Sequence, residues 1–208
     1  TMRVAVLALH DGLAEASRLR AITSPAERAR AFELALLVAC GGAAAAASAY
    51  LDLRLRVPGH AILRAVFPMI LGLAAVPRRG AGTVMGASAL LTGVGLRAVV
   101  PAAGFSLGAL TSLTLVGPFL DLAVRRARGG WRLYTGFALA GLAANLVAFF
   151  IRGGAKMLGL EHAGARPLSE WLLQASATYA ICGLLAGLAS GAIWFQAARP
   201  RKQREASG

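Results

Sequence analysis

Long apolar stretches follow one another with little interruption between residues 31 and 198 of this sequence. A helix needs about 20 mostly apolar residues to cross the hydrocarbon core of a bilayer, where every backbone polar group must be satisfied internally. The stretches therefore predict an all-α integral membrane protein, a bundle of about six transmembrane helices. The predicted spans are residues 31–51, 61–76, 80–100, 103–124, 133–151 and 171–198.

The predicted spans leave no linker long enough to separate two folded units, so we predict one membrane domain over residues 31–198. Residues 1–30 are then a cytoplasmic N-terminal extension, and residues 199–208 a basic cytoplasmic tail. The extension ends in residues 24–27, which read Ser-Pro-Ala-Glu and match the order of a capping box with proline at the first helical position. A juxtamembrane helix should begin there, before the membrane.

The composition excludes a soluble globular domain. Hydrophobic residues make up 57% of the chain, charged residues only 15%, and the mean hydropathy is +0.64, whereas about a quarter of a soluble domain is charged. The net charge of +13 is spread over short clusters between apolar stretches, which is typical of membrane orientation and does not indicate a nucleic-acid partner. Cys40 and Cys182 both fall inside predicted spans, so neither a disulfide framework nor a thiolate metal site is expected.

The distribution of Lys and Arg predicts the orientation of the chain. If the six spans alternate, 15 of the 22 basic residues lie on the side that carries both termini and seven lie on the other side. Basic loops stay in the cytoplasm, so we predict that both termini are cytoplasmic. The first ten residues carry a short apolar run, too short for a signal-peptide core, and we expect this N-terminus to be retained in the cytoplasm.

Two predicted spans carry regular faces of small residues. Ala35, Ala39 and Ala43 recur every four positions in the first span, and glycines at 183, 187 and 191 do so in the last. Such faces let two helices approach closely in lipid, where van der Waals packing replaces the hydrophobic effect. For the first span, both a neighbouring helix of the same chain and a separate subunit fit this pattern. For the last span we expect a neighbouring helix of the same chain.

Polar residues at the predicted outer end indicate where a ligand could bind. His60 and Arg64 are four apart and share a helix face at the outer mouth of the second span. Asn145 lies inside the fifth span, where it could line a ligand cavity or hydrogen-bond between helices. The outer loops, including the long connection 152–170, carry more basic than acidic residues, which favours an anionic or hydrogen-bonding small molecule. Alternatively, these charges only hold the outer interface in place.

The polar residues of the spans form no recognisable catalytic set. Asp121 and Arg125 are four apart at the predicted cytoplasmic boundary, and we expect a simple ion pair. Gly-x-Ser-x-Gly occurs once, at residues 104–108, but a chain predicted to be all-helical has no strand-to-helix turn to form the nucleophile elbow of that motif. His-Glu-x-x-His does not occur, and no phosphate-binding Gly-xxxx-Gly-Lys-Ser/Thr loop is present in the sequence. We therefore predict neither enzyme activity nor a cofactor.

Several of these features, in their order along the chain, resemble one family of membrane proteins. The small-residue face of the first span is followed by Pro-Gly-His at 58–60, a glycine-rich third span, and Gly-Ala at 108–109 with Gly-Pro at 117–118 in the fourth. This order is similar to that of the membrane-embedded substrate-binding S component of energy-coupling factor (ECF) transporters, nearest to their cobalt and nickel branch. The similarity covers residues 35–126.

The resemblance implies a multi-pass protein of the bacterial cytoplasmic (inner) membrane that captures a vitamin-like micronutrient or a metal ion. Its partners would be a transmembrane coupling subunit and two ABC-type ATPases, which supply the ATP hydrolysis. In that family the small-residue face docks the coupling subunit, and the matching positions here are Ala35, Ala39 and Ala43. The substrate-binding candidates are His60, Arg64 and Asn145.

One departure from the family concerns metal ions. Metal-binding members begin with Met-His, whereas this sequence begins Thr1-Met2-Arg3, so His60 is the single matching metal ligand. One imidazole is a weak ligand set for a divalent ion. The alternative to a transporter subunit is a structural or assembly membrane protein with no small-molecule ligand.

Overall fold

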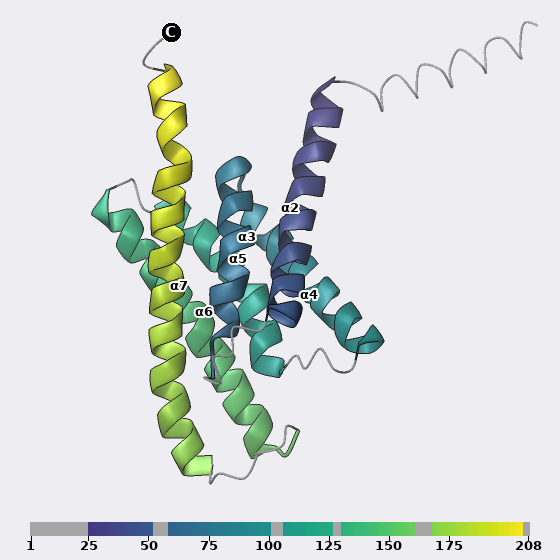
Figure 1. The fold of residues 1–208 in the computed structure, drawn as a ribbon, viewed down its shortest axis with the longest axis vertical. Coiled ribbons are helices and arrows are strands. Elements are labelled where there is room, and N and C mark those ends of the chain that lie inside the picture. The colour runs from purple at the N-terminus through teal and green to yellow at the C-terminus, as the bar shows by residue number, and fades with distance from the viewer. Residues whose placement is uncertain (1–24, 52–57, 101–105, 127–129, 161–167, 206–208) are drawn as a thin grey trace, which may run out of the picture. The chain divides into compact units, whose positions relative to one another are not determined.

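The computed structural model describes residues 25–51, 58–100, 106–126, 130–160 and 168–205. Within these ranges every regular element is an α-helix (Figure 1). The chain divides into two compact units, Thr1–Leu36 and Leu37–Gly208. The described part of the first unit is the start of helix α2, and the second unit holds the rest of α2 and five further helices.

The helices lie where the apolar stretches predict them. They are α2 (Pro25–Tyr50), α3 (Ala61–Ala75), α4 (Ala81–Val99), α5 (Leu107–Arg126), α6 (Trp131–Met157) and α7 (Leu168–Glu205). All but α3 are long and apolar enough to cross a membrane. The predicted all-α, multi-pass membrane character is therefore confirmed. Helix α2 is described from Pro25 onward, and the predicted capping residue Ser24 lies outside the described residues.

Helix α3 is the short one, with 15 residues and so a length of about 22 Å. It contacts α4, α5 and α7 (Figure 1). A helix that is apolar on most sides is typical of a protein core or of a membrane span; α3 packs one side against these helices and leaves Phe67 and Leu71 exposed. Its buried residues are Ile62, Ala65, Val66, Met69, Ile70, Gly72 and Leu73.

Helices α4 and α5 touch through their backbones. A Cβ atom added to Gly82 would overlap the carbonyl oxygen of Gly117, and one added to Gly117 would overlap the carbonyl oxygen of Gly82. Gly86, one turn further along α4, lies in the same way against the carbonyl of Thr114. Glycine at these positions removes the side chains that would hold the two helices apart.

Helices α6 and α7 run side by side in opposite directions (Figure 1). A Cβ atom at Gly141 would overlap the carbonyl oxygen of Gly183, and one at Gly187 would lie 2.6 Å from the Cα atom of Ala138. The third glycine of the face, Gly191, lies against the ring of Tyr134. The prediction that this small-residue face packs within the chain is therefore confirmed.

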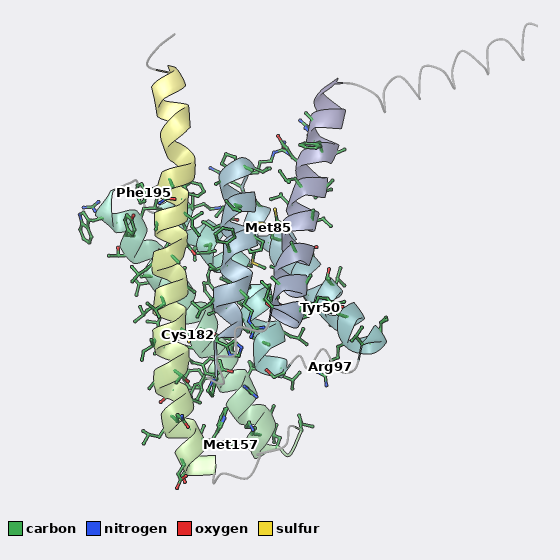
Figure 2. All side chains as sticks on the ribbon, in the orientation of Figure 1. Tyr50, Met85, Arg97, Met157, Cys182 and Phe195 are labelled. Atoms are coloured by element: carbon green, nitrogen blue, oxygen red, sulfur yellow. The ribbon has the colours of Figure 1, made fainter. Side chains whose placement is uncertain are left out.

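From Leu37 onward, α2 packs against α4. The hydroxyl of Ser88 donates to the carbonyl of Val38 at 2.7 Å, and a Cβ atom at Gly41 would lie 2.9 Å from the Cβ atom of Ser88. Met85, labelled in Figure 2, is fully buried on the same side of α4. The stripe of α2 that faces the bundle is therefore Leu37, Gly41, Ala44 and Ala45.

The connection between the last two helices is shorter than the predicted loop 152–170. Helix α6 continues to Met157 and α7 begins at Leu168. The added turns carry Arg152 and Lys156, whose charged groups lie over the ring of Trp171 at 5.8 and 4.9 Å. These long side chains can reach the interface from a helical backbone, so their charges do not end the helix.

The last predicted span, 171–198, agrees with the apolar part of α7, Ser169–Gln196, and the helix itself continues beyond it to Glu205. Once the chain has left the bilayer, Arg, Lys, Gln and Glu are all good helix formers and allow the helix to extend.

Candidate functional site

The turn that precedes α3 brings His60 and Arg64 together. The guanidinium of Arg64 is hydrogen-bonded to the Nε2 atom of His60, donates to the carbonyl of Ser48 at 2.9 Å, and also donates to the carbonyl of Leu51. The last carbonyls of a helix have no partner within the helix, and a cation near them also stabilises the helix dipole. Arg64 therefore ties the C-terminal end of α2 to the start of α3, while His60 shares its face as predicted.

Asn145 is fully buried and joins four parts of the chain. Its Oδ1 atom accepts from the hydroxyl of Ser112 in α5 at 2.8 Å. Its Nδ2 group donates to the carbonyl of Tyr179 in α7 at 2.7 Å and to the carbonyl of Gly59 at 3.2 Å. Of the two interpretations open from the sequence, interhelical hydrogen bonding is the one these contacts display. A role for Asn145 in ligand binding stays a prediction.

Gly59 has a backbone that few other residues could adopt in this place. Its φ angle is +85°, in the left-handed region, and a Cβ atom would lie 2.9 Å from the Tyr179 ring and 3.1 Å from the Asn145 amide. The Pro-Gly-His turn is thus pressed onto the buried amide, with His60 directly after the contact point. Asn145 contributes to this end of the bundle by positioning the turn that carries His60.

An aromatic cluster lies beside this turn. The rings of Phe149 and Tyr179 are 5.7 Å apart, and Phe149 and Trp171 are 6.2 Å apart and stacked. Ala148 and Ala175 pack in the same cluster. Together with the basic groups over Trp171, the cluster gives this end of α6 and α7 an apolar interior and a positively charged surface.

Two of the predicted docking residues, Ala39 and Ala43, lie on the face of α2 that the bundle does not use. Ala39 and Ala43 are exposed, whereas Leu37, Gly41, Ala44 and Ala45 are buried. Ala35 lies one turn before Ala39 on the same helix, in the first unit. The contact of α2 with α4 therefore does not involve Ala39 or Ala43, and a docking role for the alanine face stays a prediction.

Asp121 forms the predicted ion pair with Arg125, with nitrogen to oxygen distances of 2.8 and 3.2 Å. It is also buried, and its Oδ2 atom accepts from the backbone N–H of Gly80 at 2.9 Å. The first N–H groups of a helix lack partners within it, and Gly80 is the residue before α4. Asp121 therefore holds the start of α4 onto α5, a role that the local i, i+4 pattern could not reveal.

In the part of the chain that the structure describes, no cluster of metal-ligating side chains is preformed. Within those residues no three His, Cys, Asp or Glu side chains come together in a way that could hold an ion. His10, His162 and Glu161 lie outside the described residues, as do Arg54, Arg56 and Arg166 of the predicted outer loops. The assignment of His60 as a metal ligand stays a prediction.

Sequence reasoning missed two contacts between distant residues, one at the Asn145 site and one at the opposite end of the bundle. Ser112 carries no signal by itself, and its pairing with Asn145 joins residues 33 positions apart. The bond between Gly80 and Asp121 spans 41 positions.

No protein-family model matches the sequence, and no curated protein or solved structure matches it either.

Proposed function

We propose that this chain is the substrate-binding subunit of an ECF-type ABC uptake transporter for a vitamin-like micronutrient or a metal ion. The observation that carries the proposal is the exposed alanine face of α2, at Ala39 and Ala43. The bundle packs against the other side of the helix, through Gly41. A face of small residues that the bundle leaves uncovered is what a second transmembrane subunit requires for close approach.

The physical argument concerns the choice of residues on this face. A helix surface that meets only lipid has no need for small side chains, since Leu, Ile, Val and Phe are equally well solvated by acyl chains. Other exposed positions of the bundle carry such residues, for example Leu91, Leu173 and Ile181. A single exposed alanine such as Ala87 carries no such signal, but alanine recurs every four positions at 39 and 43, and this recurrence is better explained by a partner helix than by lipid.

We further propose that both termini are cytoplasmic and that the ligand enters at the opposite end, where His60 and Arg64 meet. This orientation is supported by the excess of Lys and Arg at the ends of the helices on the side of the termini. The guanidinium of Arg64 and the imidazole of His60 would select an anionic or hydrogen-bonding ligand. ATP hydrolysis would take place in the partner ATPases.

The decisive experiment compares four leucine substitutions in the full chain, expressed with candidate coupling subunits and ATPases. Ala39→Leu and Ala43→Leu should abolish co-purification of the partners and leave the folded, isolated protein unchanged in its unfolding midpoint. Ala87→Leu, at an exposed alanine of α4, is the matched control and should retain the complex. Ala44→Leu, at a fully buried position of α2, should instead destabilise the protein itself.

If the complex persisted in both Ala39→Leu and Ala43→Leu, this face would not be the docking surface, and the proposal would lose its structural support. The alternative function, a structural or assembly membrane protein without a small-molecule ligand, is favoured by an interior whose central amide already bonds three protein groups. Native mass spectrometry separates the two. A co-purifying micronutrient or metal that is lost in His60→Ala or Arg64→Ala supports transport, and a protein that is empty in every preparation supports the structural role.

A further inference from the structure

An open groove lies between the C-terminal half of α5 and the N-terminal half of α6, at the end of the bundle opposite His60. Its volume is about 580 Å³. The lining residues recur at helical spacing on both walls, so each helix presents one continuous face to the groove. The main apolar contributors are Phe119 and Leu122 of α5 and Leu139, Ala140 and Ala143 of α6.

The groove is as long as one leaflet is thick. Its lining on α6 runs from Arg132 to Ala143, which at 1.5 Å per residue corresponds to about 16 Å. The hydrocarbon core of a bilayer is about 30 Å thick, so one leaflet contributes about 15 Å. An acyl chain of ordinary length therefore matches the apolar walls from end to end.

Two arginines stand at one end of this groove. Arg126 is the last residue of α5 and Arg132 is the second residue of α6, and both line the groove with exposed side chains. Among the described residues no carboxylate pairs with either guanidinium: Asp121 is buried and pairs with Arg125. The sequence contains no further acidic residue between Asp121 and Glu161. The end of the groove is therefore positive and lacks a compensating anion from its own helices.

The neighbouring aromatic residues place this end at the height of the lipid headgroups. Trp131, the first residue of α6, is 72% exposed. Tyr134, one turn later, stacks on Phe195 of α7 at 4.7 Å, and Phe195 lies near the end of the bundle far from Met157 (Figure 2). Exposed Trp and basic residues at the ends of apolar helices are typical of the membrane–water interface. The arginines therefore lie at headgroup depth and the apolar walls at acyl-chain depth.

We propose that this groove binds one anionic glycerophospholipid, with its phosphate between Arg126 and Arg132 and one acyl chain along the walls of α5 and α6. A soluble anion would satisfy the guanidiniums and leave the apolar walls without a partner. A zwitterionic lipid would fill the walls and bring no net charge to the arginines. The combination of two cations with an apolar channel one leaflet long selects a lipid with net negative charge. This inference does not depend on the transporter assignment.

The test titrates the purified, detergent-solubilised protein with phosphatidylglycerol and with phosphatidylcholine of identical acyl chains, and counts bound lipids by native mass spectrometry. The parent protein should retain one phosphatidylglycerol in preference to phosphatidylcholine. Removing both charges in Arg126→Gln/Arg132→Gln should weaken phosphatidylglycerol binding by about 30-fold, because each basic residue contributes about fivefold to attraction of an anionic lipid. Phosphatidylcholine binding should not change.

Two matched controls isolate the site. Arg30→Gln/Arg79→Gln removes two exposed charges elsewhere and should leave the lipid preference intact. Ala143→Phe, which fills the inner end of the groove, should reduce lipid retention, whereas Val147→Phe, one turn further and outside the lining, should not.

Equal retention of the two lipids by the parent would overturn the proposal. An unchanged preference in the double arginine variant would do the same, and so would an equal loss in the control variant, which would indicate a general charge effect. Displacement of the bound lipid by millimolar glycerol phosphate would identify a soluble-anion site in place of a lipid site.

Discussion

Single polar side chains inside this bundle serve to join helices. Asn145 holds the 58–60 turn, α5 and α7 together, Ser88 holds α2 to α4, and Asp121 holds the start of α4 to α5. Inside a membrane these groups have no water to bond, so each must find a protein partner. The measured strength of such bonds is modest, on average about 0.6 kcal/mol each. Their main effect is therefore to fix which helices are neighbours.

The contact of Gly59 with the Asn145 amide can be tested by substitution, because Gly80 offers a control with nearly the same backbone φ angle. Both have positive φ, +85° and +87°, but a Cβ atom at Gly80 would meet nothing within 4 Å. Gly80→Ala should lower the free energy of unfolding by about 1 kcal/mol, the strain of a left-handed alanine. Gly59→Ala should cost about 1–3 kcal/mol more, because its methyl group would also crowd Tyr179 and Asn145. Thermal unfolding in detergent measures both.

Equal losses in the two variants would mean that the turn does not press on the Asn145 amide. In that case Asn145 would have room to contact a ligand, and the cavity interpretation of this residue would regain support.

Pairs of helices are held at short distance by glycine, at Gly82 and Gly117 between α4 and α5 and at Gly141 and Gly187 between α6 and α7. In lipid the approach of two backbones replaces the hydrophobic burial that drives helix association in water. The same principle underlies the proposal that the exposed alanines of α2 dock a partner subunit. The packing of the helices within the fold and the proposed docking of a partner therefore have the same physical cause, the close approach of two helix backbones at small residues.

Gly187→Ala should therefore destabilise the protein strongly, since the new methyl group would overlap the carbonyl oxygen of Phe137 on α6. Overpacking of this kind costs about 1–3 kcal/mol. Gly154→Ala, in the same helix pair but with open space around it, should leave stability unchanged or raise it by up to about 1 kcal/mol through helix propensity. The measurement is the unfolding midpoint of both variants in detergent. If Gly154→Ala were the more harmful substitution, the α6–α7 contact described above would be wrong.

Charge and hydropathy act at the scale of the whole molecule. Five helices are long enough to span a bilayer within the described part of the chain, and α3 adds an apolar segment of about 22 Å. The hydrocarbon core is about 30 Å thick. The surrounding helices and local thinning of the bilayer would allow so short a helix to cross fully, and the crossing by α3 stays a prediction.

Cysteine labelling tests both the orientation and the crossing by α3. In a parent without Cys40 and Cys182, Leu160→Cys and Leu51→Cys should react with a membrane-impermeant maleimide added outside cells. Arg79→Cys should react only after permeabilisation. All three positions are exposed. Reversed labelling would contradict the cytoplasmic termini. Labelling of Leu51→Cys and Arg79→Cys from the same side would show that α3 does not cross.

Much of the fold could be predicted because hydropathy and helix length are local properties. The spans at 61–76 and 80–100 match α3 and α4 within one residue at each end, since Gly80 and Pro77 interrupt the chain there. The end of α6 was predicted too early, because a basic residue such as Arg152 signals the membrane boundary and not the end of a helix. Periodicity also identified the glycine face of α7 and the Asp121–Arg125 pair.

The sequence by itself thus determined that the chain is helical and membrane-embedded, and which residues share a helix face. Tertiary structure alone decided which face meets which neighbour. It placed Gly41, and not Ala39 or Ala43, against α4, and it placed Ser112 and Gly59 beside Asn145. It also brought Arg126 and Arg132 to the end of one groove. The physical reason is that every side of a membrane helix is apolar, so hydropathy does not distinguish the side that packs from the side that meets lipid.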